Sequence, residues 1–157
     1  MENLFFGILL VYALLGGSAL FMIYEDVRKQ TIPLSGLSLF IGAALLKQAW
    51  EPDLEGFWSA CAIALILWGC QGLFYLFKRE AAMGRGDLLL SPFCGLWLYL
   101  HELPVFFLST VLIALLTGIF WRYRWGLRTF PFAPAILFGL GILFFIRCFF
   151  NEEWGMN

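Results

Sequence analysis

The chain has 157 residues, of which 62% are hydrophobic, 19% aromatic and 13% charged. Soluble domains are roughly 45–50% apolar and about 25% charged, so the composition excludes an ordinary soluble domain and predicts an integral membrane protein. The net charge of −1 offers no basic patch for nucleic acid, and the four cysteines lack the C-x-x-C spacing of a zinc site.

Six apolar runs, separated by short charged or Pro/Gly-bearing links, predict an all-α polytopic protein built as a bundle of about six transmembrane helices. They lie near residues 4–24, 34–50, 57–77, 88–100, 104–121 and 132–150. The fourth run has about 13 residues, fewer than the roughly 20 of a spanning helix. We therefore expect it to be tilted, extended into its flanks or shielded by its neighbours. The runs use nearly all of residues 1–157, which predicts a single integral-membrane domain.

The links between these runs alternate in charge along the chain. Eight of the ten basic residues fall in the first, third and fifth links, at Arg28, Lys29, Lys78, Arg79, Arg85, Arg122, Arg124 and Arg128. The second and fourth links are acidic. By the positive-inside rule the basic links face the cytoplasm, which places both termini outside. The first run lacks a basic n-region and is predicted to be a retained helix rather than a cleaved signal peptide.

Two aspartates, Asp26 and Asp87, are predicted to lie on this cytoplasmic side at the same membrane depth. An ionised carboxylate near hydrocarbon is costly, so such residues are usually paired or functional. If the two carboxyls meet, their like charges oppose double ionisation and they share one proton, the arrangement that an aspartic protease uses without a metal. Two plainer interpretations stay open: weak ion pairs with basic residues such as Arg28 or Arg85, and an N-cap role for Asp87.

Three stretches resemble the motifs of the type IV prepilin peptidases. The segment EDVRKQTIPLSGL, residues 25–37, is similar to their D-x-R-x-x-x-I-P segment, and GRGD, residues 84–87, is similar to their G-x-G-D motif. A third segment, FPFAPAILFGLG at residues 130–141, resembles their P-F-G-P segment at the opening of the last helix. The motifs occur in the order of the family, and the resemblance covers nearly the whole chain.

This resemblance implies a membrane aspartic endopeptidase that removes the short basic leader from type IV prepilins or pseudopilins. It places the site at the cytoplasmic face of the bacterial inner membrane, with Asp26 and Asp87 in the catalytic positions and no metal or cofactor. The implied partners are the substrate helix and the lipid bilayer, with no preference indicated for an oligomeric state.

Five further motif residues carry over by the resemblance. Gly84 and Gly86 are expected to give the substrate backbone room to reach Asp87, and Arg28 either orients a carboxylate or holds the topology. Pro33 and Pro131 are expected to mark helix starts, since proline is tolerated in the first helical turn.

The chain also departs from the family pattern. Leu34 follows I-P where asparagine is common, Leu89 stands where lysine is common after G-x-G-D, and Ala133 replaces the glycine of P-F-G-P. These changes leave substrate preference and catalytic rate open. The chain resembles the short, peptidase-only members, including those that serve tight-adherence (Flp-type) pili, so we expect no N-terminal methyltransferase domain.

Two other functions fit the same residues. A catalytically inactive relative could serve a pilus or protein-secretion machine as an assembly partner, which the altered motif neighbours allow. A small proton-coupled transporter could use the two aspartates as a relay. Against the transporter, both aspartates are expected at one face, and no acidic residue is expected deeper in the bundle.

Overall fold

The computed structural model describes residues 2–79, 83–125 and 131–150, and these residues form helices and connecting turns without a strand. The helices are α1 (Glu2–Lys29), α2 (Leu34–Trp50), α3 (Leu54–Lys78), α4 (Arg85–Gly95), the short 3-10 helix η1 (Leu100–Glu102), α5 (Leu103–Trp125) and α6 (Ala133–Phe150). The predicted all-α class is confirmed. Arg128 of the fifth link lies outside the described residues.

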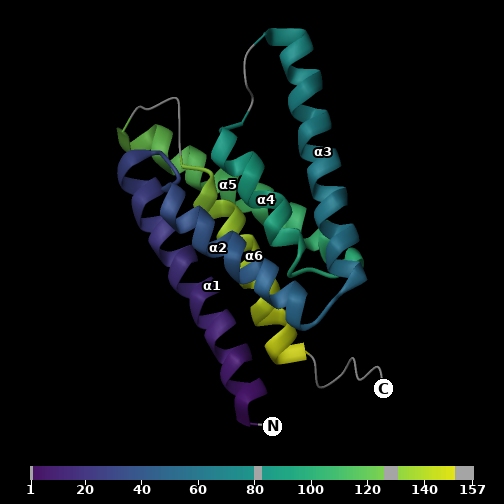
Figure 1. Cartoon of the computed structure of the whole chain (residues 1–157). Coiled ribbons are helices and arrows are strands. Elements are labelled where there is room, and N and C mark those ends of the chain that lie inside the picture. Colours follow the sequence, from purple (N-terminus) through teal and green to yellow (C-terminus); the bar gives the residue numbers. More distant parts are fainter. Residues whose placement is uncertain (1, 80–82, 126–130, 151–157) are drawn as a thin grey trace.

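Consecutive helices form the main packing pairs of the bundle (Figure 1). α1 packs along α2, α3 along α4 and α5 along α6, while α6 also contacts α1 and α4. The buried core includes Met22, Phe40, Leu90, Trp97 and Ile136. α3 lies at the edge of the bundle, on the right in Figure 1. The central place of α6 brings its first residues to the end of the bundle where α1 finishes.

Three helical stretches are long and apolar enough to cross a membrane: Leu9–Lys29, Leu54–Phe77 and Leu100–Arg124. α2 and α6 are shorter apolar helices. The span in α3 has only 6% of its residues buried inside the protein, and large apolar side chains such as Leu65, Trp68 and Leu76 are exposed along it. Such a surface is stable against lipid rather than water, as expected for a multi-pass membrane protein.

α4 ends at Gly95, earlier than the predicted limit at residue 100. A Cβ on Gly95 would lie 2.6 Å from the Cα of Ala60, so this glycine lets α4 approach α3 closely. The carbonyl of Leu96 accepts a hydrogen bond from Lys47 Nζ at 3.1 Å instead of continuing the helix. With 11 residues, α4 is about 16 Å long at 1.5 Å per residue. It is therefore a short helix shielded by its neighbours.

α1 continues to Lys29, five residues past its predicted end. The extension is charged, and the salt bridge between Glu25 and Lys29, 2.6 Å long at i,i+4 spacing, lies along it. Such pairs stabilise a helix although they interrupt its apolar pattern. Gln30 then ends the helix with a left-handed φ of 54°. Asp26 is therefore part of the last turns of α1 and not of a link.

Candidate active site

Asp26 is buried near the end of α1, with 4% of its surface exposed. Its Oδ2 accepts a hydrogen bond from the backbone N–H of Ala133 at 3.2 Å, a residue 107 positions later in the chain. Ala133 is the first residue of α6. The N-terminus of a helix carries unpaired N–H groups and a partial positive charge, so α6 presents a group that favours a carboxylate.

Asp87 lies in the first turn of α4, at the third helical position. The N-cap of this helix is Gly84, so the interpretation of Asp87 as the N-cap is wrong. The Asp87 carboxyl instead turns back and accepts a hydrogen bond from the backbone of Gly84. Its Oδ1 is buried and has no hydrogen-bond partner among the described residues. The Asp87 carboxyl is thus hydrogen-bonded to Gly84, while its Oδ1 is free to exchange a proton.

The two motif glycines leave room for the groups packed around Asp87. A Cβ on Gly84 would lie 2.9 Å from Asp87 Oδ2, and a Cβ on Gly86 would lie 3.0 Å from Ile32 Cδ1. Contacts this short are essentially absent or rare for real Cβ atoms. Gly84 therefore lets the carboxyl fold back on its own helix, and Gly86 lets α4 approach the link that follows α1.

The three sequence motifs converge at one end of the bundle. Asp26 of the first motif contacts Ala133 of the third, and Ile32 of the first packs on Gly86 of the second.

Asp87 lies on α4, outside the three helices that are long enough to span a membrane. Burial of its carboxyl and, next, the charge of Asp26 raise the pKa of Asp87 to about 7, against the opposing effect of the Gly84 N–H. The two carboxyls are therefore close enough for the charge of Asp26 to act on Asp87.

A carboxyl pair that holds one proton can both accept and donate a proton near neutral pH. This is the chemistry of general acid–base catalysis, including the attack of water on a carbonyl group. Within the described ranges, no three His, Cys, Asp or Glu side chains lie together as metal ligands.

The other predicted site residues lie around the pair. Arg28 is exposed and donates a hydrogen bond to the Tyr24 hydroxyl at 2.5 Å. Pro33 is the N-cap of α2, and Pro131 is buried two residues before α6 begins. Both prolines thus precede a helix rather than stand in its first turn. Leu34 and Leu89, where the motif pattern changes, are 80% and 47% exposed.

Two contacts of the site could not be identified from residue types. The Ala133 donor is a backbone group, and Ile32 packs through an aliphatic side chain. Both residues lie inside the quoted motif segments, and this position was the one indication in the sequence that they belong to the site. Among the altered positions, Ala133 is the one that contacts a catalytic candidate, and it does so through an atom that every residue except proline supplies.

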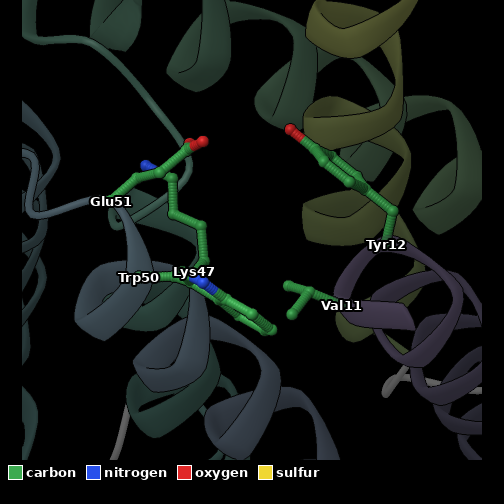
Figure 2. A pocket seen from close by; sticks show the side chains of 5 residues that line it. All are labelled: Val11, Tyr12, Lys47, Trp50 and Glu51. Carbon is green, nitrogen blue, oxygen red and sulfur yellow. The ribbon is translucent and has the colours of Figure 1, made fainter. Parts of the chain in front are cut away.

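A separate hollow lies about four helical turns before Asp26 along α1. It is lined by Val11, Tyr12, Lys47, Trp50 and Glu51. Figure 2 shows Tyr12 and Glu51 facing each other across it. Because α2 runs back from the site end of α1, this hollow is remote from the two aspartates. It adds no group to the carboxyl pair.

Comparison with known proteins places the chain among the leader peptidases. Residues 13–119 match the model of the type IV leader peptidase family. The prepilin leader peptidase/N-methyltransferase of Neisseria gonorrhoeae is 32% identical over 114 residues, covering 73% of this chain and 38% of that protein. The chain thus aligns with less than two fifths of that relative. No solved structure gives a significant match.

Proposed function

Because this chain belongs to the type IV leader peptidase family, we propose that it is an aspartic endopeptidase that cleaves the leader from type IV prepilins or pseudopilins. Asp26 and Asp87 are the catalytic residues. The proposal is supported by the placement of Asp26 on α1 and Asp87 on α4 at the same end of the bundle, close enough for the charge of Asp26 to act on Asp87.

The placement of charge supports a site at the cytoplasmic face of the inner membrane. α1 ends with Arg28 and Lys29, and α5 ends with Arg122 and Arg124. Positive residues concentrate on the cytoplasmic side of bacterial membrane proteins. In this orientation the substrate helix stays in lipid while its extended leader crosses the carboxyl pair.

The altered motif neighbours act on substrate preference in this proposal. Leu34 and Leu89 are exposed close in sequence to Ile32 and Asp87. Such exposed apolar side chains are available to an incoming segment, whereas the two carboxyls keep their own hydrogen-bond partners. A substrate with apolar residues near its scissile bond fits these two leucines.

Cleavage in cells tests the proposed function. A type IV or Flp-type prepilin is co-expressed with the wild type, with Asp26→Asn and with Asp87→Asn, and leader removal is read as a gel mobility shift. Glu25→Gln is the matched control, since Glu25 neighbours Asp26 in the chain but pairs with the exposed Lys29. We expect the wild type and Glu25→Gln to cleave the prepilin, and the two asparagine variants to leave it uncleaved.

Membrane levels of every variant are measured in the same cells. Cleavage that survives either asparagine substitution would overturn the assignment of the pair. Wild-type protein that accumulates normally yet cleaves none of several prepilins would instead favour an inactive assembly partner.

A further inference from the structure

The two carboxyls of the site differ in their surroundings. Asp26 receives its hydrogen bond from the first backbone amide of another helix, α6. A charged acceptor strengthens such a bond, and the positive end of the helix dipole favours negative charge there. Among the described residues neither Asp26 nor Asp87 forms a salt bridge, so backbone groups provide the charge stabilisation.

Asp87 also receives one backbone hydrogen bond, from Gly84. The difference is its second oxygen, Oδ1, which is buried without a partner in the described part of the chain. Burying an unpaired charged oxygen costs much more than burying a neutral one. A proton on Oδ1 lowers that cost and provides an O–H donor for a substrate. The raised pKa of Asp87, about 7, agrees with this placement.

We propose that Asp26 is the general base, held ionised and oriented by the N–H of Ala133, and that Asp87 is the general acid. Ala133 is thereby a positioning residue. This inference rests on the proposed peptidase function and deepens it, because it gives each carboxyl a separate role.

The assigned roles give a balanced hydrolysis. Water attacks the scissile carbonyl carbon, its proton passes to the Asp26 carboxylate, and the Asp87 proton passes to the carbonyl oxygen, which forms a neutral gem-diol. The C–N bond then breaks. The proton on Asp26 moves to the leaving nitrogen, and a gem-diol hydroxyl returns its proton to Asp87. The products are one carboxylic acid and one amine, and both aspartates regain their starting states.

Substitution of Ala133 by proline tests the positioning role. Proline lacks the N–H and is favoured at the first helical position. The amide of Ala133 is also free of the helix ladder, which starts with Ala135 and Ile136 donating to Phe132. Ala133→Gly is the matched control, because it keeps the N–H. We expect Ala133→Pro to lower kcat by about tenfold or more with KM within about twofold, and Ala133→Gly to cleave like the wild type.

The outcomes separate the inference from the function on which it rests. Absence of cleavage by both the wild type and Ala133→Gly defeats the proposed function itself. Equal kcat for Ala133→Pro and Ala133→Gly, with equal melting temperatures in detergent, defeats the positioning role alone. A loss in Ala133→Pro that appears only as a higher KM also defeats it.

Infrared spectroscopy tests the two roles without relying on the proline variant. At about pH 6, where an ordinary carboxyl is ionised, the difference between wild type and Asp87→Asn should contain the carbonyl band of one protonated carboxyl. Other protonated groups cancel in this difference. If the band persists in Asp87→Asn, the proton resides elsewhere and the assignment of base and acid is overturned.

Discussion

Two sets of acidic side chains at opposite ends of this bundle, Glu102 with Asp53 and Asp26 with Asp87, have opposite surroundings. At the end remote from Asp26, Glu102 accepts hydrogen bonds from Arg147 Nε at 2.6 Å and from the Tyr99 amide at 2.8 Å. Asp53 there is paired with Lys47 at 3.5 Å. At the other end, Asp26 and Asp87 have backbone donors, and the charge of Asp26 acts on Asp87. Glu102 and Asp53 pair with cations and join helices, whereas no salt bridge reaches Asp26 or Asp87 among the described residues.

The acidic side chains remote from the site explain why two basic residues lie outside the positive links. Lys47 and Arg147 are the exceptions to the charge pattern of the sequence. Each neutralises a carboxylate at the end of the bundle remote from the site, Lys47 on Asp53 and Arg147 on Glu102. They therefore add little net charge to that end and leave the charge asymmetry across the membrane intact.

Removing a carboxyl of the pair is expected to have the largest effect. Asp26→Asn, Asp87→Asn and the double variant should each lower cleavage by about a thousandfold or more, with the double no worse than the singles, because the two groups act as a unit. Their melting temperatures in detergent should not fall, since a costly buried carboxyl is removed. A double variant far worse than either single would show that the two carboxyls do not act as a unit.

Gly84→Ala is expected to come next. Its Cβ would lie 2.9 Å from Asp87 Oδ2, so the carboxyl must move. Displacing a catalytic group by about 1 Å can cost on the order of a hundredfold in rate. Gly42→Ala is the control, because a Cβ there meets no atom within 4 Å. Initial cleavage rates in detergent measure both variants, and equal rates would contradict the packing role of Gly84.

The pH dependence gives a smaller effect with a definite sign. The pKa of Asp87 is raised to about 7 by burial and by the charge of Asp26, so the acid is protonated below that value and loses its proton as the pH rises. We expect kcat/KM to fall about tenfold per pH unit above about pH 7. Melting temperatures over the same range control for unfolding. A rate that keeps rising to pH 9 would contradict this role.

Glu102→Gln should have the smallest effect on cleavage and a clear effect on stability. It leaves the guanidinium of Arg147 without its carboxylate, and the pair is partly exposed, with side chains 25% and 11% accessible. A loss of about 1–2 kcal/mol in the free energy of unfolding follows, with cleavage within about twofold. Denaturation in detergent measures the first quantity. A large loss of cleavage at unchanged stability would contradict the purely structural role of Glu102.

The sequence predicts the helices well where apolar runs are long. It also supplies the motif segments, because their residue types and order are distinctive. It misplaces the end of α1, since the Glu25–Lys29 pair continues the helix through charged residues. The early end of α4 is followed by a hydrogen bond from Lys47, on another helix, to the Leu96 carbonyl. The donor from Ala133 to Asp26 joins positions 107 residues apart. Contacts of this kind follow from tertiary packing and leave no local pattern.

The most direct test of the account is whether positions 26 and 87 meet in the membrane. Asp26→Cys and Asp87→Cys are combined in a chain whose four native cysteines are replaced, and a short bifunctional thiol reagent is applied to isolated membranes. Asp26→Cys with Asp53→Cys is the control pair, because Asp53 caps α3 at the opposite end. The account predicts an intramolecular cross-link for 26 with 87 and none for 26 with 53. Equal cross-linking of both pairs, or none for 26 with 87, would contradict the shared site.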